Sequence, residues 1–145
     1  MFQFSLVTPH EVHSRHTYYL NGIASAIEKG GSDHGAGEVM REIYNGGVYL
    51  YDVTGEDDDM LHGFVVLQEH TDRYSRKLVL HVDYAYLSQL RSGLMRLYQS
   101  FPRFAAAKGF DQIAFNSNRK GWDKYCERTG FNGATRIFYK DLHHG

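Results

Sequence analysis

The segment from Lys77 to Phe131 constrains the fold most, because strand and helix patterns alternate along it. Apolar side chains alternate from Leu78 to Tyr86, which predicts a strand, and they recur at helical spacing from Ser92 to Lys108. A short strand is expected at Gln112 to Phe115, followed by a short helix at Gly121 to Thr129. This alternation predicts an α/β domain with a mixed sheet.

The preceding part of the chain predicts antiparallel strands. Phe2, Phe4 and Leu6 alternate with polar residues, which indicates a short strand at the N-terminus. Val48 to Thr54 and Gly63 to Glu69 are two further strand patterns, separated by polar turns from each other and from the strand at Leu78. We expect these last three strands to form an antiparallel meander.

Two helices are predicted between the first strand and the meander. The first runs from about Pro9 to Lys29, with Thr8 as its N-cap and Glu11 at the capping-box position. The second is short and runs from Gly37 to Asn45, where two glycines end it.

The C-terminal part contains one element that conflicts with a regular helix. Pro102 lies inside the helix expected from Ser92 to Lys108 and should kink it or break it near Ser100. A last strand is expected from Thr135 to Lys140.

Composition indicates a single domain covering residues 1–145, which is long enough to bury a core. The formal net charge of −1 gives no argument for binding nucleic acid or an anionic membrane. Cys126 is the only cysteine, so we expect a reducing, cytoplasmic location. The N-terminus lacks the pattern of a signal peptide, and no apolar run predicts a membrane span.

Two segments resemble motifs of one enzyme family. Gln89-Leu90-Arg91-Ser92-Gly93-Leu94 matches the form Q/R-x-x-G-x-G/A in part, with Ser92 and Leu94 at glycine or small-residue positions. The segment from Asn116 to Phe131 resembles N-x-x-A-x-x-F-Y-x-x-x-G-F, with Tyr125 on the aromatic position and Gly130-Phe131 at the end. With the element order, these motifs give the chain a resemblance to the GNAT-type acyl-CoA N-acyltransferases over nearly its whole length.

The resemblance implies a fold class and an activity. The fold is a GNAT-like mixed, mostly antiparallel central sheet flanked by helices, here with a shortened C-terminus after Phe131. The implied activity is direct transfer of an acetyl group from acetyl-CoA, as co-substrate, to a primary amine on a small molecule or a protein. The shortened C-terminus leaves the acceptor side more open, or completed by a second subunit in a homodimer.

The resemblance also implies which residues bind the cofactor. In the family, the strand that precedes the glycine motif uses exposed amides to hold the thioester carbonyl and the pantetheine arm, and the motif holds the pyrophosphate. The corresponding positions here are Tyr84, Ala85, Leu87, Gln89, Arg91, Ser92, Gly93 and Asn118.

Candidate catalytic groups follow in the same way. Asp83 is a candidate general base, and Glu69, at the end of the preceding strand, is the rival. Cys126 stands where many family members carry the tyrosine that protonates the departing thiolate, and Tyr125 is the alternative acid. Solvent-exposed carboxylates and a buried structural cysteine are the competing interpretations.

A second functional hypothesis is a catalytically inactive GNAT-like binding or structural protein, similar to small phage proteins. Ser92 and Leu94 in the glycine motif and the short C-terminus favour it. His10, His13 and His16 recur every three residues, but no companion ligand is evident, so we expect a solvated helix face and no metal site.

Overall fold

A computed structural model describes residues 1–30, 35–115, 130 and 140. The elements within this part of the chain are β1 (Phe2–Leu6), α1 (Pro9–Ser14), α2 (His16–Gly30), α3 (Ala36–Asn45), β2 (Tyr49–Gly55), β3 (Leu61–Thr71), β4 (Leu78–Leu87), α4 (Leu90–Ala107) and β5 (Gln112–Phe115). The helix expected at 121–129 and the strand expected at 135–140 lie outside the described residues, apart from Lys140.

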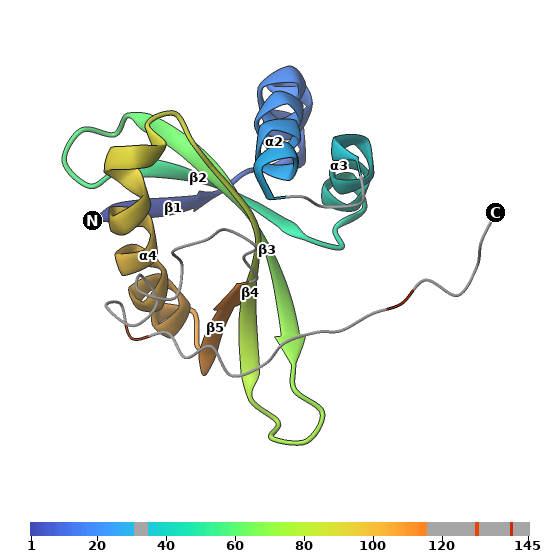
Figure 1. The fold of residues 1–145 in the computed structure, drawn as a ribbon, viewed down its shortest axis with the longest axis vertical. Helices are drawn as coiled ribbons and strands as arrows, with labels where there is room; N and C mark the ends of the chain where they lie inside the picture. Colours follow the sequence, from blue (N-terminus) through green and yellow to red (C-terminus); the bar gives the residue numbers. More distant parts are fainter. Residues whose placement is uncertain (31–34, 116–129, 131–139, 141–145) are drawn as a thin grey trace.

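The strands form one five-stranded sheet in the order β1-β2-β3-β4-β5. The first four strands pair antiparallel, and β4 pairs with β5 in parallel. Helices α2 and α3 lie on one face of the sheet, and α4 lies on the other (Figure 1). The predicted fold class is therefore confirmed, including the meander of β2, β3 and β4.

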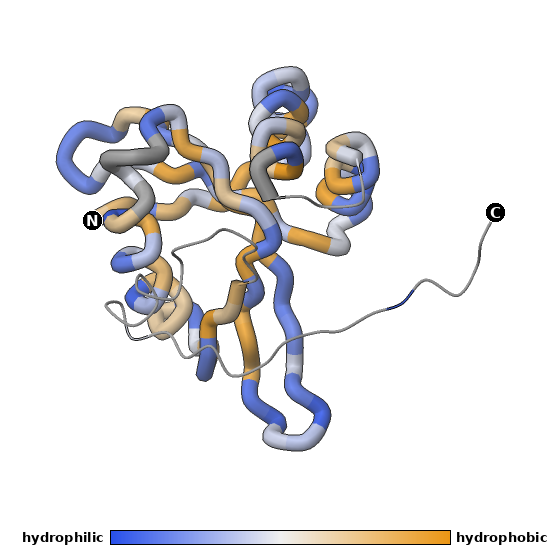
Figure 2. The backbone as a smooth tube through the Cα atoms, viewed as in Figure 1, coloured by the Kyte–Doolittle hydropathy of each residue, from blue (hydrophilic) through white to orange (hydrophobic). Residues whose placement is uncertain are grey.

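The sheet separates two hydrophobic cores. Under α4, side chains from the strands pack with one face of that helix, including Val53, Val65, Leu67, Leu80, Val82, Leu87, Leu97, Phe101 and Ala105. On the opposite face, the strands pack with α1, α2 and α3, including Val12, Tyr19, Ile23, Val39, Met40, Leu50, Phe64 and Val66. Figure 2 shows apolar segments in the middle of the sheet and a hydrophilic turn at the far end of β3 and β4.

The first predicted helix is interrupted at Arg15, so the prediction of a single helix from Pro9 to Lys29 is wrong. Arg15 has φ −115° and ψ 27°, which is outside the helical range. Its N–H still donates to the carbonyl of Glu11, and the N–H of Tyr19 donates to the carbonyl of Arg15. The interruption is therefore local, and the capping box of Thr8 and Glu11 is present as predicted.

Helix α4 continues through Pro102, so of the two predicted effects of this proline, a kink or a break near Ser100, the break is absent. A proline inside a helix costs about 3 kcal/mol. Leu97 and Phe101 are fully buried on the same helix, and each such side chain contributes about 1.5–3 kcal/mol. The Ser100 hydroxyl also accepts the N–H of Phe2 at 2.9 Å and donates to the carbonyl of Arg96. Burial and this link to β1 outweigh the proline.

Within the described residues, no helix is long and apolar enough to cross a membrane.

Candidate active site

A β-bulge interrupts β4 at Asp83. Tyr84 is paired with Val66 of β3, whereas Leu67, the next residue of β3, is paired with Val82. Asp83 is therefore an extra residue in β4 with no partner of its own in the β3–β4 register. The bulge changes the face of the side chains that follow: Val82 packs in the core under α4, but Tyr84 packs against the core under α2.

The described pairing between β4 and β5 ends next to this bulge, at Val82 and Phe115. The N–H of Ser88 donates to the carbonyl of His62 on β3 at 2.8 Å. Because hydrogen-bonded and non-hydrogen-bonded pairs alternate along an antiparallel ladder, Ala85 and Leu87 direct their amides away from β3. These two predicted carbonyl-binding amides thus point toward the side on which β5 pairs with β4.

Tyr84, the third predicted amide donor, has the other orientation. The same alternation directs its amide toward Val66 of β3. Its side chain packs on the face covered by α2. The structure therefore separates Tyr84 from Ala85 and Leu87.

Asp83 lies in a small polar group on the face of the sheet that α2 and α3 cover. Its Oδ1 is 2.7 Å from Nδ1 of His81, and its Oδ2 accepts a hydrogen bond from the side-chain amide of Gln68 at 3.4 Å. The side chains of His81 and Asp83 are 28% and 20% exposed, so solvent or a substrate can reach both. The sequence analysis did not identify His81, although its position two residues before Asp83 in a strand places both on one face.

Glu69, the rival candidate base, lies on the opposite face of the sheet. It is paired with Leu80, which belongs to the core under α4. Glu69 contributes to the raised pKa of Tyr51, after the larger effects of burial and of Tyr49. Since Tyr51 also packs against the α4 core, the two candidate carboxylates cannot serve the same substrate position.

The glycine motif occupies the start of α4. The helix begins at Leu90, two residues earlier than expected, and its N-cap Gln89 makes no side-chain capping bond. The N–H of Gly93 donates to the carbonyl of Gln89 at 3.0 Å, so it is already used within the helix. In an α-helix the amides of the first three residues, here 90–92, have no intrahelical acceptor, and amides in this position can bind an anion.

Gly93 also has a packing role. A Cβ atom at this position would lie 3.1 Å from Cδ1 of Leu87 and 3.7 Å from the ring of Phe2. The glycine therefore lets α4 approach β1 and β4 closely. The side chains of Arg91 and Ser92 are outside what the structure describes, as are Asn118, Tyr125 and Cys126 entirely.

A small pocket of about 50 Å³ adjoins the start of α4, and the sequence did not predict it. Its lining is formed by Phe2, His62, Leu87, Gln89, Gly93 and Arg96. The guanidinium of Arg96 lies 4.2 Å from the centre of the Phe2 ring, and Nε2 of His62 is 3.4 Å from Oδ2 of Asp58. The pKa of Asp58 is lowered, first by the N–H of Met60 and then by His62.

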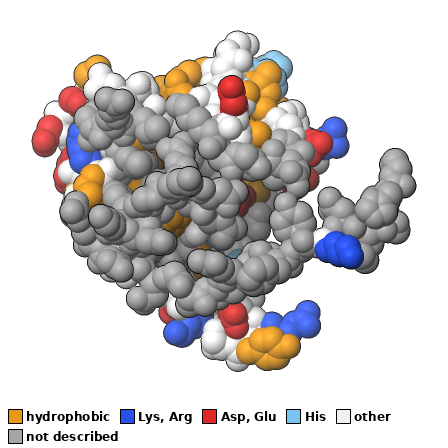
Figure 3. Space-filling view, in the orientation of Figure 1, with side chains coloured by type: hydrophobic (Ala, Val, Ile, Leu, Met, Phe, Trp, Pro, Cys, Tyr) orange, Lys and Arg blue, Asp and Glu red, His pale blue; other side chains and the backbone are white. Residues whose placement is uncertain are grey.

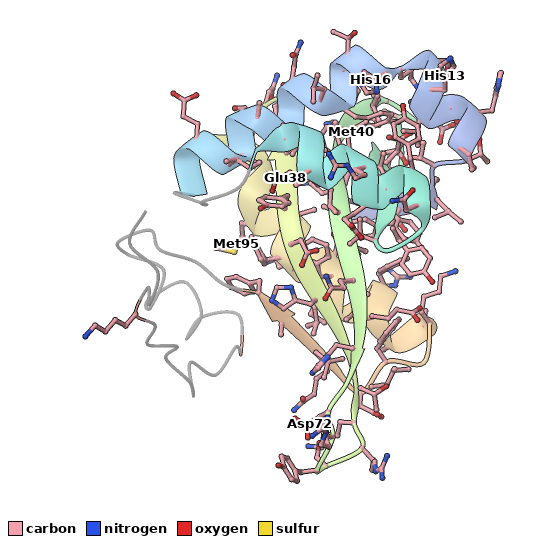
Figure 4. All side chains as sticks on the ribbon, turned by 90° about the vertical axis from the view of Figure 1, so that its right-hand side faces the viewer. His13, His16, Glu38, Met40, Asp72 and Met95 are labelled. Atoms are coloured by element: carbon pink, nitrogen blue, oxygen red, sulfur yellow. The ribbon has the colours of Figure 1, made fainter. Side chains whose placement is uncertain are left out.

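The histidines of the first helices do not converge. His16 makes a contact of 2.8 Å between its Nδ1 and the hydroxyl of Tyr44 on α3, and His10 and His13 are exposed. Figure 4 shows His13 and His16 at the α1–α2 end of the molecule, far from Asp72 at the tip of the β3–β4 hairpin. His16 therefore helps to join α2 to α3.

The β3–β4 hairpin ends in exposed polar residues. Figure 3 shows positive side chains beside a hydrophobic one at this end of the molecule. The hairpin carries Arg73, Arg76 and Lys77, and Tyr74 is 91% exposed. Asp72 accepts the N–H groups of Tyr74 and Ser75, and these bonds fix the turn.

The similarities to known proteins concern the fold. No family model matches the sequence, and no curated protein matches it. Among solved structures, a possible acetyltransferase from Clostridium difficile 630 has a TM-score of 0.67 at 8% identity, covering 99% of each chain. A ribosomal-protein-alanine N-acetyltransferase from Brucella melitensis biovar Abortus 2308 has a TM-score of 0.64 at 14% identity, covering 100% of each chain.

A third similar structure is the aminoglycoside N-acetyltransferase AAC(6')-Iy in complex with CoA, with a TM-score of 0.65 at 14% identity, covering 99% of this chain and 96% of that one. The fold of this protein is thus the fold of the GNAT-type acetyltransferases, as the sequence resemblance predicted. At these identities the similarity establishes the fold alone, and evidence for an activity has to come from the residues of the site.

Proposed function

We propose that this protein is an acyl-CoA-dependent N-acetyltransferase that transfers an acetyl group directly to a primary amine. The observation that carries this proposal is the bulge at Asp83 in β4. It directs the amides of Ala85 and Leu87 to the side of β4 where a thioester can lie. The GNAT-type fold supports the proposal.

The chain offers suitable groups for each part of acetyl-CoA. The amides of Ala85 and Leu87 would hold the thioester carbonyl and the pantetheine arm, and they would stabilise negative charge on the carbonyl oxygen during attack. The amides at the start of α4 and the positive end of its helix dipole would hold the pyrophosphate. Arg91 would add a positive charge beside those amides.

The proton transfers need two further groups. The polar group around Asp83 is the candidate acceptor for the amine proton, because it is accessible and lies on β4 next to these amides. Glu69 would have to act from the opposite face of the sheet. Cys126 or Tyr125 remains the predicted acid that protonates the thiolate.

A catalytically inactive binding protein is the second candidate function. One observation favours it: close packing against Leu87 and Phe2 explains Gly93 without any cofactor. On this view α4 begins at an ordinary helix N-terminus, and acetyl-CoA should neither bind nor raise the melting temperature.

Binding of coenzyme A to charge variants of α4 tests the two candidates. Arg91→Glu places a negative charge in the first helical turn, where it favours the helix but repels a pyrophosphate. Arg103→Glu is the matched control, because it makes the same charge change on the same helix, about 18 Å away at ~1.5 Å per residue.

Titration calorimetry should show a dissociation constant at least about tenfold higher for Arg91→Glu, which corresponds to ~1.4 kcal/mol. Arg103→Glu should differ from the wild type by less than about twofold, because screening at physiological salt has a length of ~8 Å. A thiol-release assay with acetyl-CoA and a panel of primary amines then tests transfer. Absence of coenzyme A binding in the wild type would favour the inactive binding protein.

A further inference from the structure

We propose that His81 is the catalytic base that accepts the amine proton and that Asp83 is a positioning residue that holds His81. This inference rests on the proposed acetyltransferase function and revises the sequence-based hypothesis that Asp83 acts as the base. It is carried by the contact of 2.7 Å between Nδ1 of His81 and Oδ1 of Asp83.

This contact determines which nitrogen of His81 is available. An ionised carboxylate can only accept hydrogen bonds, so Nδ1 of His81 carries the proton that it donates to Asp83. In the neutral ring, Nε2 then has the free lone pair. Within the described residues, Nε2 has no hydrogen-bond partner, and the side chain is 28% exposed.

Asp83 is less available than His81 for the amine. Both of its oxygens have partners, Oδ1 in His81 and Oδ2 in the side-chain amide of Gln68. These two contacts come from β4 and β3, so they fix the carboxylate from two strands. A fixed carboxylate is suited to orienting an imidazole, which in turn reaches farther from the strand than Asp83 does.

The other described polar groups on this face do not provide a second carboxylate that could orient His81. Cross-strand register places Gln68 opposite His81, and His70 lies two residues further along β3, opposite Val79. Tyr84 follows Asp83 on the same face, and Ala114 is the partner of His81 on β5. Glu69 lies on the other face. Among the described residues, Asp83 is therefore the carboxylate that contacts His81.

The location of His81 is also consistent with attack on a thioester held by β4. His81 lies on the same strand as Ala85 and Leu87, and the bulge at Asp83 separates it from them. The proposal requires the amine to lie between His81 and the amides of those two residues, so that its proton passes to Nε2 directly or through one water molecule.

The reaction balances as follows. The amine nitrogen attacks the thioester carbonyl carbon, so that a C–N bond forms and the C–S bond breaks. Nε2 of His81 takes the proton from nitrogen and later releases it to solvent. The thiolate takes a proton from the predicted acid or from water, which gives the amide and the free thiol.

The pH dependence of kcat/KM separates an imidazole from a carboxylate. Model imidazoles titrate near pH ~6.5 and model aspartates near ~3.9. With His81 as the base, kcat/KM should fall on the acid side of the wild-type profile as the imidazole takes up a proton, and His81→Gln should lose ~10²–10⁴-fold in kcat/KM together with this limb. His70→Gln is the matched control on the same face and should retain the wild-type rate within about twofold.

Asp83→Asn tests the positioning role with a readout that does not depend on turnover. Long-range ¹H–¹⁵N spectra of the imidazoles should show His81 protonated at Nδ1 in the wild type and a mixture of tautomers in Asp83→Asn. The same variant should lower kcat much more than it raises KM for acetyl-CoA. Melting curves check that each variant is folded.

The results distinguish this inference from the proposed function. If the wild type acetylates an amine and His81→Gln keeps its rate within about threefold, the assignment of His81 is overturned and the proposed function stands. If His81 of the wild type is protonated at Nε2 and unprotonated at Nδ1, the positioning role of Asp83 is overturned. If the wild type neither binds coenzyme A nor acetylates any amine, the proposed function fails and the role of His81 with it.

Discussion

The hydroxyl of Tyr19 gives the sharpest test of how the first helices are attached to the sheet. Tyr19 and Asp52 are 0% and 9% exposed, and the Tyr19 hydroxyl donates to Oδ1 of Asp52 at 2.8 Å. The other oxygen of Asp52 accepts from Arg15 at 3.0 Å, and Arg15 also binds Glu11. This network joins α1 and α2 to β2 through the position where the two helices are interrupted.

We expect Tyr19→Phe to destabilise the protein. A hydrogen bond to a charged group contributes about 1.5–3 kcal/mol, and the substitution removes it while keeping the ring. For a chain of this size, ~2–4 °C per kcal/mol gives a fall in melting temperature of about 3–12 °C. In a protein that already carries Asp52→Asn, Tyr19→Phe should lower the melting temperature by less, because the two substitutions affect the same hydrogen bond.

Tyr18→Phe is the matched control. Tyr18 is the neighbouring tyrosine on α2, and its ring contacts Tyr19, Phe64 and Tyr86. Within the described residues its hydroxyl has no hydrogen-bond partner, so the substitution should change stability by less than about 0.5 kcal/mol. Equal effects of the two substitutions in thermal and urea unfolding would show that the bond between Tyr19 and Asp52 does not stabilise the protein.

The same network predicts a response to alkali. Burial, followed by the hydrogen bond to Asp52, raises the pKa of Tyr19 far above its ordinary value. A group with a raised pKa in the folded state stabilises the protein below the unfolded pKa of ~10 and loses that contribution as the pH rises further. Melting temperatures of the wild type should therefore fall more steeply above pH ~10 than those of Tyr19→Phe.

Three further predictions concern other parts of the fold. Gly22→Ala should destabilise the protein by about 1–3 kcal/mol in urea unfolding, because the new Cβ would lie 2.6 Å from the buried ring of Phe64. This loss should exceed the gain from the better helix propensity of alanine. An unchanged unfolding midpoint would show that α2 can move away from the sheet. Hydrogen bonds from Ser75 and then from Tyr74 lower the pKa of Asp72, so this carboxylate stabilises the hairpin above pH ~4 and less as the pH falls below that value. The difference in melting temperature between the wild type and Asp72→Ala should accordingly narrow between pH 7 and pH 3; a constant difference would contradict this. Cys126→Ala should lower kcat by ~10²–10⁴-fold with little change in acetyl-CoA binding if the thiol protonates the leaving group, and a normal turnover would leave Tyr125 as the predicted acid.

Local patterns in the sequence were sufficient for most of the elements. Alternation of apolar residues predicted the ends of β1 to β5 to within about two residues. The capping box at Thr8 and Glu11 predicted the start of α1. These features depend on neighbouring residues, so they are visible without knowledge of the fold. Gly46 ends α3 with φ 78°, a backbone conformation that glycine adopts without strain.

Local patterns failed where tertiary contacts compete with them. Pro102 predicts an interruption of α4, but Leu97 and Phe101 gain enough from burial to keep the helix continuous. Arg15 has no sequence signal for leaving the helix, and its side-chain partner Asp52 is 37 residues away. Neither outcome follows from residue propensities alone.

The candidate active site shows most clearly which features local sequence patterns predict and which depend on contacts between distant segments. Patterns in the sequence were enough to predict the α/β order, the strand that carries Asp83 and a helix after that strand. Three features become visible only in the folded chain: Asp83 is an extra residue in β4, Glu69 faces the opposite side of the sheet, and His81 and Gln68 contact the Asp83 carboxylate. The physical reason is that cross-strand register depends on hydrogen bonds between separate segments, and a shift of one residue exchanges the two faces of a strand.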